Sequence, residues 1–154
     1  MVPGIDGGYT GPGDIYPELA KEIIAYPNLI SVQMDHRFRG NLDPCVQDLL
    51  ETIDILKLNY NVRRVVLVAT VGSQTTGAGS VGQLSRKGKA CLFIHCTGDD
   101  CLSPTCSREL YQLAGQPKEL VLYYGDNHGV TNHRYQAREK IKEFALQYLC
   151  IPIY

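Results

Sequence analysis

Apolar residues along this chain fall into two patterns that alternate with one another. Short, nearly continuous apolar runs are typical of buried strands in a parallel sheet, whereas apolar residues spaced by three and four predict helices. The predicted strands are 1–3, 29–35, 65–71, 90–95 and 119–124, and the predicted helices are 14–26, 43–56, 104–113 and 135–149.

Two of these helices begin with clear start signals. Asp43 and Ser103 are each followed by proline, which suits an N-cap residue before a proline in the first turn. The apolar stripes predicted to face inward are Val46, Leu49, Leu50, Ile53 and Leu56 in the second helix and Cys106, Leu110 and Leu113 in the third.

The alternation of strands and helices predicts the fold class. Strands joined by helices form right-handed crossovers that place helices on both faces of a sheet. We therefore expect an α/β fold, a three-layer sandwich with a mostly parallel sheet of about five strands in the order 2-1-3-4-5, built as one domain over residues 1–154.

Composition and charge argue against several kinds of binding partner and cofactor. The 154 residues carry 15 basic and 16 acidic side chains, and a net charge of -1 provides no field for nucleic acid. No apolar run reaches the length of a membrane span, and the first residues lack the pattern of an export signal, so a cytoplasmic location is expected. The spacing of Cys91, Cys96, Cys101 and Cys106 favours small core residues over a metal site, and no cofactor is expected.

Candidate chemistry follows the last two predicted strands. Asp99 and Asp100 follow one strand and His128 follows the next, and the carboxyl ends of neighbouring parallel strands share one edge of a sheet, so either aspartate could meet the histidine there. An aspartate that accepts a hydrogen bond from one imidazole nitrogen leaves the other nitrogen able to take a proton from a nucleophile. The plainer alternatives are that Asp99 braces a turn and that His128 lies in an exposed turn.

The order of several motifs resembles the α/β-hydrolase family. His95-Cys96-Thr97-Gly98-Asp99 with Leu102-Ser103-Pro104 is similar to the acid loop of that family, and Gly125-Asp126-Asn127-His128-Gly129 is similar to its histidine loop. Residues 35–40 resemble a turn after an earlier strand, and Pro3-Gly4-Ile5 resembles the segment that offers an oxyanion donor. The resemblance implies that Asp99 is the triad acid, His128 the base and the Ile5 amide an oxyanion donor.

The chain departs from this family at the nucleophile. The family places its serine in a Gly-x-Ser-x-Gly elbow, but the corresponding position here is Val71, and residues 69–89 are too few for the elbow, its helix and another strand. This suggests an internally truncated hydrolase in which activity on a carboxylic ester or related acyl substrate is impaired. Ser73, just beyond the predicted strand, is the candidate substitute nucleophile, and an ordinary loop serine is the alternative.

Two other functions stay open from the sequence. Gly77, Gly79 and Gly82 match a dinucleotide-binding pattern, although they do not directly follow a strand. A hydrolase shell without catalysis would bind a small ligand or a partner protein instead. A shortened sheet would also expose apolar strand edges, which predicts association between copies of the chain.

Overall fold

A computed structural model describes residues 1–3, 8–39, 42–68 and 90–149 of the chain. It divides into two compact units, Met1–Gly72 with Ala145–Tyr154, and Ser73–Phe144, and each is described by itself. The described elements are the 3-10 helix η1 (Pro12–Asp14), the helices α1 (Ile15–Ile23), α2 (Leu42–Tyr60), α4 (Pro104–Leu113) and α5 (Arg134–Leu149), and the strands β1 (Cys91–Cys96) and β2 (Lys118–Tyr123).

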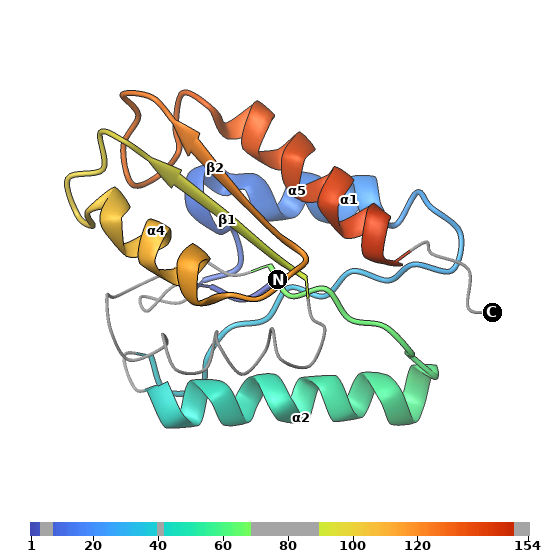
Figure 1. Cartoon of the computed structure of the whole chain (residues 1–154). Helices are drawn as coiled ribbons and strands as arrows, with labels where there is room; N and C mark the ends of the chain where they lie inside the picture. The colour runs from blue at the N-terminus through green and yellow to red at the C-terminus, as the bar shows by residue number, and fades with distance from the viewer. Residues whose placement is uncertain (4–7, 40–41, 69–89, 150–154) are drawn as a thin grey trace. The chain divides into compact units, whose positions relative to one another are not determined.

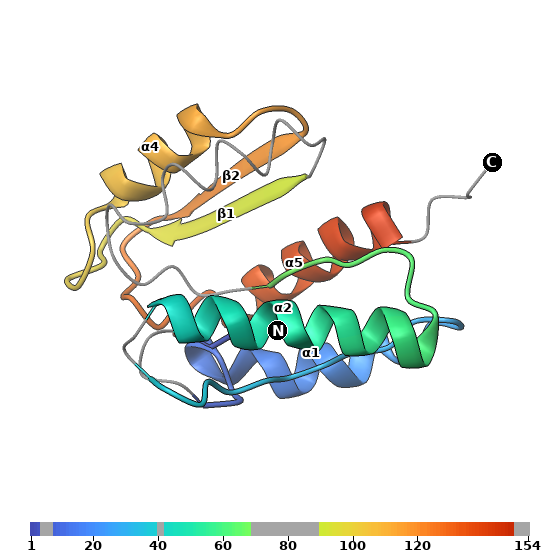
Figure 2. The same ribbon diagram turned by 90° about the horizontal axis from the view of Figure 1, so that it is seen from below.

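The second unit is built on a parallel pair of strands. β1 and β2 pair in a register that runs from Cys91 opposite Lys118 to Cys96 opposite Tyr123. The two strands lie between α4 and α5 in both views (Figures 1 and 2), as expected for strands joined by a helical crossover. The predictions of strands at 90–95 and 119–124 and of the helices that follow them are confirmed.

Helix α4 is fixed to both strands through Tyr111. The Tyr111 ring meets Phe93 of β1 edge to face, with ring centroids 6.4 Å apart, and the Lys118 ammonium of β2 lies 4.5 Å from its centroid. Lys118 Nζ also donates to the carbonyls of Tyr111 and Ala114, at 2.7 and 2.8 Å. A cation at the last carbonyls of a helix satisfies groups that have no partner within the helix.

The predicted start of α4 is also confirmed. Oγ of Ser103 accepts a hydrogen bond from the amide of Thr105 at 3.3 Å, and Pro104 is the first helical residue. On the other side of the strands, α5 is joined to β2 by an ion pair between Lys140 and Glu119. Helix α4 thus contacts both strands, and an ion pair links α5 to β2.

The first unit has its core on α1. Ile15, Tyr16 and Leu19 are at most 2% exposed, and the Tyr16 hydroxyl donates to the carbonyl of Val2 at 2.9 Å. The Tyr16 ring lies beneath Gly11, where a Cβ would fall 2.6 Å from the ring, and φ is 68°. Only glycine fits this position, because both the space and the left-handed backbone exclude a side chain.

Extended segments of this unit meet at the start of the chain without forming a strand ladder. The Val2 amide donates to the carbonyl of Val68 at 2.7 Å, and the Met34 amide donates to the carbonyl of Met1 at 3.2 Å. Met1 also donates to the carbonyl of Val32, and Pro3, the next residue that faces this segment, has no amide hydrogen to continue the pairing. Residues 1–3, 29–35 and 62–68 contain no strand beyond an isolated bridge at Val2.

The prediction of a five-strand, three-layer sandwich is accordingly wrong. The described residues hold a mixed α/β arrangement with one parallel sheet of two strands. The predicted strand 65–71 is not a strand over 65–68, and its remainder lies outside the described residues together with the other candidates at 69–89.

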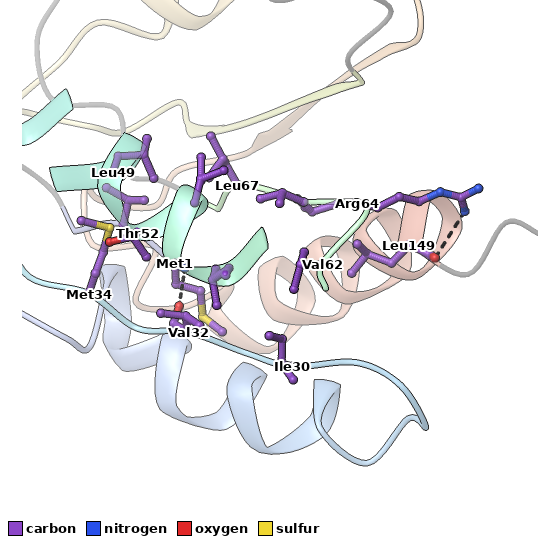
Figure 3. A pocket seen from close by; sticks show the side chains of 15 residues that line it. Met1, Ile30, Val32, Met34, Leu49, Thr52, Val62, Arg64, Leu67 and Leu149 are labelled. Atoms are coloured by element: carbon purple, nitrogen blue, oxygen red, sulfur yellow. Dashed lines mark hydrogen bonds between the residues drawn. The ribbon is translucent and has the colours of Figure 1, made fainter. Parts of the chain in front are cut away.

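An apolar cavity of about 100 Å³ lies in the first unit, between α2 and the extended segments (Figure 3). Leu49, Ile53 and Leu56 of α2 line it, as does Val32, so these α2 residues face inward as predicted. Leu50, which was predicted to do the same, is 50% exposed. In α4, Leu113 is likewise exposed, since it stands in the last turn of that helix.

Three hydrogen-bond donors hold the carboxylate of Asp35 in the first unit. Its Oδ1 accepts from the amides of Gly8 and His36 at 2.9 and 2.8 Å, and its Oδ2 accepts from Arg39 at 2.6 Å. The Gly8 amide and the Arg39 guanidinium, with the His36 amide, outweigh desolvation and lower the pKa of Asp35 from 3.8 to about 2. The carboxylate therefore ties the loop before α1 to the segment before α2.

We expect the Asp35→Asn variant to lower the melting temperature in a pH-dependent way. Because the folded-state pKa of Asp35 is depressed from 3.8 to about 2, its stabilising contribution is complete above the unfolded value and is lost as the pH falls through the folded value. Thermal unfolding should show a clear deficit at pH 6 that shrinks toward pH 2. Asp54→Asn, at an exposed position of α2, is the control, and a deficit that does not change with pH would contradict the prediction.

Candidate functional site

The candidate site lies where the loops after β1 and β2 meet. The Thr97 amide donates to the carbonyl of Tyr123 at 2.8 Å, and the Gly125 amide donates to Oγ1 of Thr97 at 2.9 Å. A Cβ at Gly98 would lie 2.9 Å from the carbonyl oxygen of Asp126, so the two backbones are in contact. The parallel register brings these loops together, as expected for strands that end at one edge.

Asp99 is the buried carboxylate of this site. Its side chain is 4% exposed, and its Oδ1 accepts from the amides of Cys101 and Leu102 at 2.8 and 2.9 Å. Its Oδ2 accepts from Nδ1 of His128 at 2.8 Å. Both oxygens are therefore satisfied, one by the backbone of its own loop and one by the imidazole of the other loop.

Opposing effects act on the pKa of Asp99. Burial raises it, but the amide of Leu102, the imidazole of His128 and the amide of Cys101 together outweigh burial and lower the pKa below its usual range. The group is thus a carboxylate near neutral pH. Because an ionised carboxylate only accepts hydrogen bonds, Nδ1 of His128 carries the proton in this contact.

His128 is open to solvent on its other side. Its side chain is 37% exposed, and among the described residues no group hydrogen-bonds to its Nε2. With the proton on Nδ1, Nε2 is a lone-pair acceptor that faces outward. This is the arrangement that a general base needs.

A second histidine contacts Asp99 from the buried side. Nε2 of His95 lies 3.2 Å from Oδ2 of Asp99 and 3.1 Å from the Leu102 carbonyl, and Nδ1 lies 2.6 Å from Oγ of Ser107. Both neighbours of Nε2 are acceptors, so Nε2 holds a proton, and in the neutral ring Nδ1 accepts from the Ser107 hydroxyl. Ser107 is 1% exposed, so this hydroxyl supports the site without access to a substrate.

A second Asp-His pair shapes the loop that carries His128. The fully buried carboxylate of Asp126 accepts five hydrogen bonds, from the amides of Asn127, Asn132 and His133, from Nδ2 of Asn132 and from Nδ1 of His133. The His133 ring stacks on Tyr123, with centroids 4.8 Å apart. The loop from 126 to 133 is therefore closed on itself around Asp126, and His128 projects from it.

Two cysteines stand near these carboxylates. Burial, with the nearby charges of Asp126 and Asp99, raises the pKa of Cys96 to about 11, so Cys96 stays a thiol. Cys101 is exposed, and its Sγ lies 3.6 Å from Oδ1 of Asp100. One ligand atom each from Asp99, Cys101 and His128 lies within 4.8 Å of the others, and these three residues are the described set that could hold a metal ion.

The structure thus brings Asp99 and His128 together, and it does not test the other site candidates. Ile5, Ser73 and the glycines Gly77, Gly79 and Gly82 lie outside the described residues, so the oxyanion, nucleophile and dinucleotide hypotheses stay predictions. His95, Ser107 and Asp126 were not singled out from the sequence as parts of this site. The spacing of four between His95 and Asp99, across a strand end, is a signal that could have indicated their contact.

Comparisons with protein-family models, with curated proteins and with solved structures find no match for this chain. No helix in the described ranges combines the length and the apolar character required to cross a membrane.

We expect the Gly98→Ala variant to disturb the contact between the two loops. A methyl group 2.9 Å from the Asp126 carbonyl oxygen forces the backbone apart, which costs about 1–3 kcal/mol in unfolding free energy. Chemical denaturation measures this cost, and the Nδ1 proton resonance of His128 should weaken as its contact with Asp99 lengthens.

Gly129→Ala is the matched control, because a Cβ there meets only side-chain oxygens of Asn127 and Thr131, at 3.3 Å, which can move. Equal stability losses in the two variants would show that the close approach at Gly98 is not the cause.

Proposed function

We propose that this chain carries the acid-base half of an acyl-hydrolase site, with His128 as the general base and Asp99 as the residue that orients it. The observation that supports this most directly is the 2.8 Å contact between Nδ1 of His128 and the buried Oδ2 of Asp99. The resemblance of both loops to those of α/β-hydrolases points to the same function.

The charge and burial of the pair suit proton transfer. When Nε2 of His128 takes a proton from a hydroxyl, the resulting imidazolium lies against the carboxylate of Asp99, which stabilises it. Since Asp99 is already satisfied by two amides, it keeps its position while the charge on His128 changes. Preorganisation of this kind avoids rearrangement during the reaction.

The proposed substrate class is a carboxylic ester or a related acyl compound. The reaction requires a hydroxyl near Nε2 of His128, and Ser73 is the candidate that the sequence offers. An acyl group would pass from the substrate to this hydroxyl and then to water, with His128 returning the proton to the leaving group. A binding protein that keeps the Asp99–His128 pair without a nucleophile is the competing function.

A fluorophosphonate probe tests the proposal, since it reacts only with an activated hydroxyl. We expect mass spectrometry to locate the label on Ser73 in the folded wild-type chain. Asp99→Asn should slow labelling by about 10⁴-fold, because the imidazole loses its orientation and its counter-ion. His128→Ala should remove labelling.

Two controls make the result specific. His36→Ala removes a half-buried imidazole of the first unit, and its labelling rate should equal that of the wild type. Unchanged labelling in Ser73→Ala would exclude Ser73 as the nucleophile. If the folded wild-type chain takes no label on any serine, catalysis by this pair is excluded and the binding function is favoured.

A further inference from the structure

The loop after β1 and the histidine loop bring together three different metal ligands. Asp99 offers a carboxylate oxygen, Cys101 a sulfur and His128 an imidazole nitrogen, all within 4.8 Å of one another. Carboxylate, thiolate and imidazole are all zinc ligands, whereas magnesium and calcium require oxygen ligands. The donor set therefore selects a borderline-soft divalent cation.

We propose that Asp99, Cys101 and His128 form a zinc-binding site in which the metal replaces the proton between His128 and Asp99. The carboxylate oxygen Oδ2 and Nδ1 of His128 already face each other at 2.8 Å. Tetrahedral zinc places its ligand atoms roughly 3.5 Å apart. The set therefore closes around an ion when Nδ1 and Oδ2 separate slightly and the exposed Cys101 side chain rotates inward.

The groups around Asp99 hold its carboxylate as a metal ligand needs to be held. Its Oδ1 is held by the amides of Cys101 and Leu102, and Nε2 of His95 lies 3.2 Å from Oδ2. Groups of this kind orient a ligating carboxylate, and losing one typically weakens metal binding by about 10–100-fold. They leave Oδ2 fixed in place when the proton of His128 is displaced.

Charge also favours a cation at this position. Two aspartates stand at the site, the ligand Asp99 and its neighbour Asp100, whose Oδ1 lies 3.6 Å from the Cys101 sulfur. On binding, Cys101 releases its thiol proton to solvent and coordinates as a thiolate. The divalent ion then balances the thiolate and the Asp99 carboxylate, and Asp100 stands close enough to add to the attraction.

Zinc at Nδ1 changes the chemistry of His128. The neutral ring carries its proton on Nδ1 when it contacts Asp99, so coordination there moves this proton to Nε2. Nε2 becomes a donor and can no longer accept a proton from a hydroxyl. Zinc would therefore act as an inhibitor of the proposed acid-base function, while the binding itself requires no nucleophile.

Competition against a chromophoric zinc chelator tests the site in the full-length chain. Loss of an outer-shell partner alone weakens metal sites by 10–100-fold, so Cys101→Ser should weaken zinc affinity by at least about 100-fold. Cobalt is a second probe, because a thiolate ligand gives a charge-transfer absorption that should be present in the wild type and absent in Cys101→Ser. Circular dichroism should show that this exposed substitution leaves the fold intact.

Cys45→Ser is the matched control, since Cys45 is a free thiol of the first unit. Zinc affinity should be unchanged in this variant and lost in His128→Ala. The nitrogen-15 spectrum of His128 should show the proton on Nδ1 without zinc and on Nε2 with it. Wild-type affinity in Cys101→Ser, or loss of affinity in Cys45→Ser, would overturn the proposal.

The two proposals fail separately. Zinc binding without serine labelling would remove the hydrolase function and keep the metal site. Serine labelling in a chain that does not bind zinc would remove the metal site alone. If both hold, zinc should slow labelling of the wild type, and it should have little effect on labelling in Cys101→Ser.

Discussion

The parallel pairing of β1 with β2 is the constraint on which the second unit depends. Because Cys96 and Tyr123 end the ladder opposite each other, two loops far apart in the sequence emerge side by side. Their backbones then approach closely enough at Gly98 to exclude a side chain. A buried carboxylate such as Asp99 is tolerated there only because amides and imidazoles from both loops satisfy it.

The two Asp-His pairs of this unit differ in whether the histidine keeps a ring nitrogen that can react. Asp126 has its carboxylate fully occupied within one loop, and His133 is stacked on Tyr123, so this pair fixes a shape. Asp99 links two loops instead, and its partner His128 keeps one nitrogen toward solvent. Both carboxylates are buried, whereas His128 is partly exposed and its Nε2 can still accept a proton. His128 is therefore the group of these two pairs that can react with a substrate.

The meeting of Asp99 and His128 could be predicted from the sequence, because strand runs and the rule for parallel edges place both residues without any knowledge of side-chain contacts. His95, Ser107 and Asp126 could not be assigned in this way, since a polar residue in a strand, helix or turn shows its partners only after folding. The five-strand sheet was predicted from apolar runs alone. Such runs do not specify pairing, and beside the 29–35 segment the amide that would continue the pairing of Met1 is missing at Pro3.

The close approach at Gly98 also has a consequence for how substitutions combine. Positions in the loop after β1 and in the loop after β2 share a backbone contact and the Asp99–His128 hydrogen bond, although they are distant in sequence. Residues that share partners show coupled rather than additive effects on stability. The effect of a substitution in one loop will therefore depend on which residues the other loop carries. A change that is tolerated with one partner loop can be destabilising with another, so the two loops vary together.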